Sequence, residues 1–131
     1  MKKNIPILIA GVIMAFTTIL HLTGGQVDHV VPLLASELDP TDKAVLLGVW
    51  HMVSVALMIM AYWLIRQGLK PVVNRNDAMR FIGWLNLLFA LVFIAVSVVR
   101  WAFAPQWILF LPMGILVLYG LRVGNDRLVE H

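Results

Sequence analysis

Long apolar stretches dominate the chain, and polar residues interrupt them at only a few places. The first stretch starts with Asn4 and Pro6, ends at the Gly24-Gly25 pair and predicts a helix over about residues 5–23. The later stretches predict helices over about residues 40–66, 77–104 and 105–123. Each stretch is long enough to span a hydrocarbon core of roughly 30 Å. The pattern therefore predicts an all-α fold, an integral membrane four-helix bundle, with residues 1–131 as a single transmembrane domain.

Polar segments connect these helices. Residues 24–39 form the longest connection, an outer loop in which Pro32 limits any helix to a short piece over about 32–38. Asp39 has the character of an N-cap for the second helix. Residues 67–76 form a basic cytoplasmic linker. The start of the chain resembles a secretory signal peptide, but the apolar run is long and no small-residue cleavage motif follows it, which favours an uncleaved helix.

Composition supports the same class. Apolar residues make up 61% of the 131 positions and charged residues 13%, whereas soluble domains have roughly 45–50% and 25%. Four spans leave too few residues for a separate soluble domain. The absence of cysteine from the sequence excludes a disulfide framework, a thiolate metal site and a thiol nucleophile.

The distribution of basic residues predicts an orientation. Two basic residues, Lys43 and Arg100, fall at the end of the bundle that holds the outer loop. The other eight fall at the opposite end: Lys2, Lys3, Arg66, Lys70, Arg75, Arg80, Arg122 and Arg127. Because basic residues accumulate on the cytoplasmic side, both termini are expected in the cytoplasm. The net charge of +3 is thus explained by membrane orientation and does not indicate nucleic-acid binding.

Four positions place an ionisable or amide side chain at membrane depth within the predicted helices: His21, His51, Asn86 and Arg100. Such groups are costly in hydrocarbon and suggest function. His51 follows the start of its apolar stretch by seven residues, which is about 10 Å of helix. His21 and Arg100 each lie within a turn of the outer end of their helices. These groups therefore converge on the outer half of the bundle.

Connectivity predicts a shared site. The first two helices are sequential and antiparallel, so we expect His21 and His51 to approach each other, with Asp28 and His29 of the loop nearby. Two imidazoles on neighbouring helices can hold haem or a transition metal. The alternative is that each histidine only bonds a backbone carbonyl and joins two helices. Arg100 is a candidate for a lipid headgroup or another anion.

The third predicted helix carries a stripe of small and polar residues. Their spacing of three and four residues places them on one face. The stripe consists of Gly83, Asn86, Ala90, Phe93, Ser97 and Arg100. Membrane helices use such residues where they pack closely, so this face, and in particular Gly83, Asn86, Ala90 and Ser97, is expected to contact other helices.

A resemblance to known proteins rests on three short motifs: H-x-T-G-G from His21, P-L-L-A-S from Pro32 and W-H-M-V-S from Trp50. They resemble a group of small four-helix bacterial membrane proteins, over about half of the chain. The resemblance implies the fold and a bacterial inner membrane, and it implies no activity.

Four functions remain open at this point. The first is a binding module with an outward-facing, histidine-lined pocket for a metal, haem or polar ligand head. The second is an enzyme acting on a lipid or quinone-like substrate, with a histidine as base and Arg100 holding an anion. No catalytic motif supports it, and no carboxylate lies at membrane depth within the predicted helices. The third is transport of a small substrate by an oligomer, although proton-coupled transporters usually keep an acidic residue inside the membrane and this sequence has none at that depth. The fourth is a structural or accessory subunit of a larger membrane complex. Besides the lipid bilayer, expected partners are a second copy of the chain or another membrane subunit.

Overall fold

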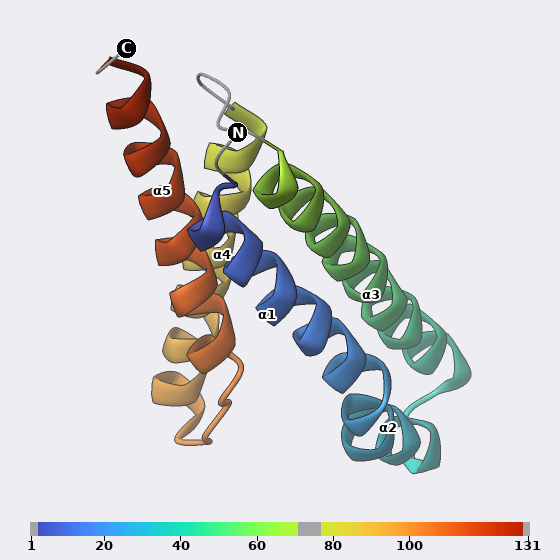
Figure 1. Ribbon diagram of the computed structural model, residues 1–131. Coiled ribbons are helices and arrows are strands. Elements are labelled where there is room, and N and C mark those ends of the chain that lie inside the picture. Colours follow the sequence, from blue (N-terminus) through green and yellow to red (C-terminus); the bar gives the residue numbers. More distant parts are fainter. Residues whose placement is uncertain (1–2, 71–76, 130–131) are drawn as a thin grey trace.

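The computed structural model describes residues 3–70 and 77–129, and most of them are helical (Figure 1). The long helices of this described part are α1 (Ile5–Leu22), α3 (Pro40–Leu69), α4 (Asp77–Arg100) and α5 (Trp107–Val129). Between α1 and α3 lie a short π-helix, η1 (Gln26–Val30), and a short α-helix, α2 (Val31–Ala35). The fold of the described residues is all-α with four long helices, as the hydrophobic pattern predicts.

Within the described residues, three helical segments are long and apolar enough to cross a membrane. They are α3, α4 and the segment Ile5–Ala35 that contains α1. The apolar part of α5, Trp107–Val123, is shorter. Large apolar side chains cover the outside of the bundle, and some, such as Val99 at 74%, are mostly exposed. Water-soluble proteins rarely expose apolar surface so extensively, whereas hydrocarbon favours it.

Local capping explains where the helices start. The side-chain oxygen of Asn4 accepts the N–H of Ile7 at 3.4 Å at the start of α1. At the start of α3, the Asp39 carboxylate accepts the N–H groups of Thr41 and Asp42, at 2.7 and 3.1 Å. Each cap satisfies backbone donors that the first helical turn leaves without partners. As a result, α1 and α3 begin at the residues predicted from the sequence. Helix α4 also begins at its predicted residue, Asp77.

The outer loop differs from the prediction. The Gly24-Gly25 pair does not end the helical backbone, because Gly25 has helical dihedral angles and the chain continues into η1. Helical structure then extends to Ala35, whereas a piece over 32–38 was predicted. The physical reason is a close contact: a side chain on Gly25 would lie 2.7 Å from the Trp50 ring, so glycine here lets η1 lie against α3.

The other helix ends also shift. Helix α4 stops at Arg100, four residues before the predicted end, because Trp101 adopts a positive φ of 50°. The N–H of Ala102 then bonds to the carbonyl of Ser97 at 3.2 Å, which is the usual way a helix closes on a left-handed residue. Helix α5 begins at Trp107 and not at 105, and it extends to Val129, past the predicted end at 123. Helix α3 continues to Leu69, three residues beyond the predicted 66.

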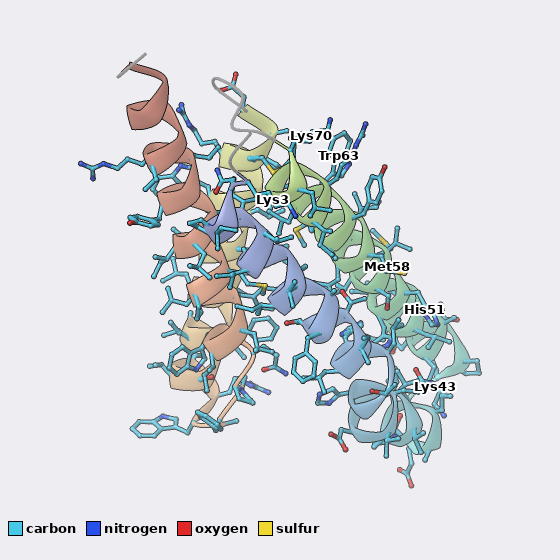
Figure 2. The ribbon with its side chains drawn as sticks, in the orientation of Figure 1. Lys3, Lys43, His51, Met58, Trp63 and Lys70 are labelled. Atoms are coloured by element: carbon cyan, nitrogen blue, oxygen red, sulfur yellow. The ribbon has the colours of Figure 1, made fainter. Side chains whose placement is uncertain are left out.

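Helix α1 is at the centre of the arrangement, because it packs against both α3 and α5, while α4 packs against α5 (Figure 1). We call the end of the bundle with the start of α1 and the end of α3 the inner end, and the end with η1 and α2 the outer end. Lys3 and Lys70 both lie at the inner end (Figure 2). Figure 1 shows α3 and α4 approaching each other toward the inner end and diverging toward α2.

The buried core lies mainly in the inner half of α3 and α4. Along α3, the buried residues begin at Ser54, and the described stretch 40–53 contains none. Along α4, they end at Ala90, and the described stretch 91–100 contains none. The bundle is therefore closely packed toward the inner end and open along α3 and α4 toward the outer end.

Two devices hold the inner half together. One is glycine at helix contacts: a Cβ on Gly68 of α3 would lie 2.5 Å from the backbone of Leu8 in α1, so only glycine permits this approach. The other is Asn4, which is 8% exposed. Its backbone N–H bonds to the carbonyl of Gly68 at 3.1 Å and its side-chain amide to the carbonyl of Gly120 at 2.9 Å. One residue at the start of α1 therefore joins α3 and α5.

Candidate functional site

The histidine in the last turn of α1 makes its contacts with α3. The ring of His21 stacks on the ring of Trp50, with centroids 3.9 Å apart and an angle of 17° between the planes. Its Nε2 atom lies 3.1 Å from the hydroxyl of Ser54 and 3.4 Å from the carbonyl of Trp50. Trp50 and Ser54 are four residues apart in α3 and so face α1 together. Stacking on Trp50 therefore holds one face of the His21 ring, and hydrogen bonds hold its Nε2 atom.

The hydrogen bonds indicate which nitrogen carries the proton. The carbonyl of Trp50 can only accept, and the hydroxyl of Ser54 already donates to that carbonyl at 3.0 Å. His21 must then donate from Nε2 to both oxygens, and in the neutral ring Nδ1 is left with a lone pair. Among the described residues, no hydrogen bond occupies Nδ1 of the half-buried His21. The arrangement presents an acceptor nitrogen in a fixed orientation.

A second histidine joins this group from η1. The ring of His29 lies 5.6 Å from the ring of Trp50, tilted by 60°. His29 is exposed, so its ring is accessible from outside the bundle. We call His21, Gly25, His29, Trp50 and Ser54 the Trp50 cluster. It connects the end of α1, η1 and α3 at the outer end.

One atom of the cluster has no hydrogen-bond partner among the described residues. The indole Nε1 of Trp50 is buried, and nothing accepts its N–H. An unpaired buried donor is unfavourable, and it is often associated with a functional site or an unplaced partner. The Trp50 cluster thus combines an unpaired donor with an acceptor nitrogen on His21.

His51 does not join the cluster. It is exposed and lines a shallow groove along α3 with Gly48 and Met52, among others. Figure 2 shows it on α3 between Lys43 and Met58. His51 and His29 both lie within electrostatic range of His21, but among the described residues no hydrogen bond or ring contact links His51 to His21. In the described structure His21 therefore contacts Trp50 and Ser54 of α3, and His51 makes no direct contact with it.

The remaining predicted ligands are also dispersed. Asp28 is exposed on η1, and no three histidine, aspartate or glutamate side chains of the described residues gather closely enough to hold a metal ion. Arg100 is exposed at the end of α4, and within the described part of the chain it makes no hydrogen bond or ion pair with Asp28 or Glu37. A metal held by three side chains is thus not supported by this part of the structure.

The stripe on α4 is placed largely as the spacing suggests. Gly83, Asn86 and Ala90 are buried, and Gly83 approaches Leu118 of α5 so closely that a Cβ would lie 2.8 Å from it. Ser97 is half-buried, and its hydroxyl accepts the N–H of Ala104 at 3.0 Å in the turn after α4.

Asn86 is fully buried, where its side chain joins two helices. Its amide donates to the carbonyl of Ile82 at 2.8 Å and lies 3.9 Å from the sulfur of Met60 in α3. Its side-chain oxygen has no partner among the described residues. The contact with Met60 links α4 to α3.

Reasoning from the sequence missed the roles of Trp50 and Ser54, and it missed the hydrogen bonds by which Asn4 joins α3 and α5. Trp50 and Ser54 appear in the motif W-H-M-V-S, and their spacing of four residues was the available signal. The choice between Trp50 and His51 as the partner of His21 depends on how α3 is rotated about its axis, which the spacing does not define.

Comparisons of the chain with known protein families, with curated proteins and with solved structures find no match. A functional assignment therefore depends on the residues and geometry described above.

Proposed function

We propose that this chain is a multi-pass protein of the bacterial inner membrane with both termini in the cytoplasm. Three helical segments of the described residues have the required length and apolar character. The bias of eight basic residues against two supports this orientation. The motifs that resemble small bacterial membrane proteins support the choice of membrane.

Reporter fusions test the orientation. A reporter fused after Arg127 is expected to behave as cytoplasmic, and a reporter inserted at Ser36 is expected to behave as external. Reporters at both sites that behave as cytoplasmic, or molecules in mixed orientation, would contradict the proposed topology.

Within this membrane protein, we propose that the Trp50 cluster binds the polar head of an amphiphile that reaches it from the outer side. The supporting observation is the orientation of His21: Nε2 is engaged with Ser54 and Trp50, and Nδ1 is left as an acceptor. A ligand head with an O–H or N–H group satisfies that acceptor. The exposed ring of His29 provides a second polar contact at the same place.

The enzyme alternative has less support. Ser54 is the hydroxyl nearest to His21, but it is 3% exposed and its proton is engaged with the carbonyl of Trp50. A serine nucleophile needs access to substrate and a base that takes its proton. Here His21 donates a hydrogen bond to Ser54, whereas a catalytic base would accept the proton of the serine.

The first experiment examines the protein purified in a mild detergent by absorption spectroscopy, metal analysis and ¹⁵N NMR of labelled histidines. We expect neutral His21 with its proton on Nε2. Adding decanol should shift the Nδ1 signal of His21, whereas its methyl ether, which cannot donate a hydrogen bond, should not. His21→Ala should remove the response of the cluster to decanol, and His51→Ala should preserve it.

The outcomes separate the alternatives. Haem or a metal bound at one equivalent would support a metallated site in place of an amphiphile site. Equal responses to decanol and its ether, or a proton on Nδ1 of His21, would contradict the proposal.

A further inference from the structure

The face of α3 opposite α1 forms a shallow groove of about 490 Å³. Its lining is almost entirely apolar and consists of Gly48, His51, Met52, Val55, Ala56 and Ile59. The buried residues of α3, such as Leu57 and Leu64, lie on the other side of the helix. Within the described chain, this face is therefore not covered by another helix.

Gly48 differs from the other glycines of the long helices whose surroundings the structure describes. At Gly11, Gly68, Gly83, Gly114 and Gly120, a Cβ would lie within 3.0 Å of a neighbouring helix or of Asn4, so glycine permits a close contact. At Gly48 a Cβ would meet nothing within 4 Å. Glycine inside a helix is destabilising relative to alanine unless it serves such a contact. The open Gly48 therefore indicates a contact with something outside the described part of the chain.

His51 leads to the same expectation from its polarity. It is exposed in this groove, about 10 Å beyond the start of the apolar stretch of α3 at the rise of an α-helix. Lipid chains offer no hydrogen-bond partner at such a depth, and ionisable residues in membranes normally face protein or water. Whatever covers the groove should bring a polar group to the depth of His51.

We propose that the groove is covered by α3 of a second copy of this chain, in a parallel dimer with a two-fold axis along the membrane normal. This inference rests on the proposed single orientation in the membrane and not on ligand binding by the Trp50 cluster. When all copies have the same orientation, the axis places identical residues of the two helices at the same depth. His51 then faces His51 of the partner subunit.

The complementarity of the two faces supports this occupant. A neutral imidazole has one donor and one acceptor, so two copies of His51 at one depth satisfy each other. Gly48 and Ala56 flank Met52 at intervals of four residues and allow the two backbones to approach closely. Met52 is 72% exposed, and its flexible side chain can fill the remaining space.

Cysteine crosslinking in native membranes tests the dimer directly, since the natural sequence contains no cysteine. Met52→Cys is placed in the groove, and Val53→Cys is the matched control, at nearly the same depth but rotated by about 100° around the helix. Mild oxidation should produce a disulfide-linked species of twice the chain mass with Met52→Cys and little with Val53→Cys. Equal crosslinking of both variants, no crosslinking of either, or a crosslinked product of another mass would overturn the proposal.

Second variants separate the interface from the fold. Gly48→Leu, added to Met52→Cys, should abolish crosslinking while leaving the unfolding temperature of the detergent-solubilised monomer unchanged, because Gly48 has open space around it. His51→Ala should raise the dissociation constant of the dimer roughly 3- to 30-fold, the range expected for one interhelical hydrogen bond in a membrane. Full crosslinking with Gly48→Leu would contradict the interface. The reporter fusions test the orientation separately, so failure of the dimer in correctly oriented protein concerns this inference alone.

Discussion

The two halves of α3 follow different packing rules. In the inner half, Gly68 lies against the backbone of α1, and Leu64 is fully buried. In the outer half, Gly48 has open space around it, and the described stretch 40–53 contains no buried residue. The same residue type thus marks a close contact within the chain in one half and an open surface in the other. We therefore expect stability to depend mainly on the inner end, whereas the proposed ligand and partner contacts lie at the outer end.

The strongest test of this contrast uses the two glycines of α3. Gly68→Leu should prevent folding, because its Cβ would meet the Cα and N of Leu8, and backbone atoms cannot move aside as side chains can. The loss of stability should exceed the roughly 1–3 kcal/mol that is typical of overpacking. Gly48→Leu should unfold at nearly the natural temperature. The measurement is thermal unfolding followed by circular dichroism in detergent, and similar losses for the two variants would remove the contrast.

A second pair of variants applies the comparison to α4. Ala90→Trp should destabilise the protein by about 1–3 kcal/mol or more, because Ala90 is fully buried in the stripe that packs against other helices. Leu88→Trp, at a position that is 56% exposed, should change stability by no more than about 0.5 kcal/mol. Gly83→Leu should resemble Ala90→Trp. Equal tolerance at positions 88 and 90 in denaturation experiments would show that the stripe is not a packing face.

Substitutions that remove polar contacts at the two ends of α1 should change stability less than the substitutions above. Asn4→Ala removes the hydrogen bond to the carbonyl of Gly120 and the cap on Ile7, so we expect a loss of about 1–2 kcal/mol. Thr23→Ala is the counterpart at the outer end, where the exposed hydroxyl bonds only to Ile19 in its own helix. Its effect should stay within about 0.5 kcal/mol. An Asn4→Ala variant as stable as Thr23→Ala would mean that the inner end is not held by Asn4.

The features predictable from the sequence are the local ones. Apolar length defined the long helices, and the caps at Asn4 and Asp39 defined where α1 and α3 begin, because a cap requires only residues a few positions apart. The end of α4 was not predictable in this way. It depends on a left-handed tryptophan, Trp101, where glycine is the usual residue.

The partner of His21 could not be predicted because α3 is apolar on every side. In an amphipathic helix the polar face shows which residues point away from the core. Without that asymmetry, Trp50 and His51, which differ by about 100° of rotation, are equally plausible partners for α1. The stripe on α4 was more informative, since its small and polar residues share one face, and Gly83, Asn86 and Ala90 are buried.

The smallest effect is expected at the start of α3. Little tertiary packing supports the helix there, so its stability depends more on the local cap. The backbone N–H groups of Asp42 and Thr41 hold the pKa of Asp39 below its ordinary value of 3.8. Since the folded state lowers this pKa, the charged cap stabilises the protein above pH 3.8, and the contribution is lost as the pH falls through the lowered value. Asp39→Asn keeps an acceptor for the cap but cannot titrate, so its unfolding temperature should fall less than that of the natural protein between pH 6 and pH 2. Because Asp39 is fully exposed, this difference should be smaller than the effect of Asn4→Ala at any pH. Thermal unfolding of both proteins in a non-ionic detergent measures it, and identical pH dependence would show that the carboxylate of Asp39 does not stabilise α3.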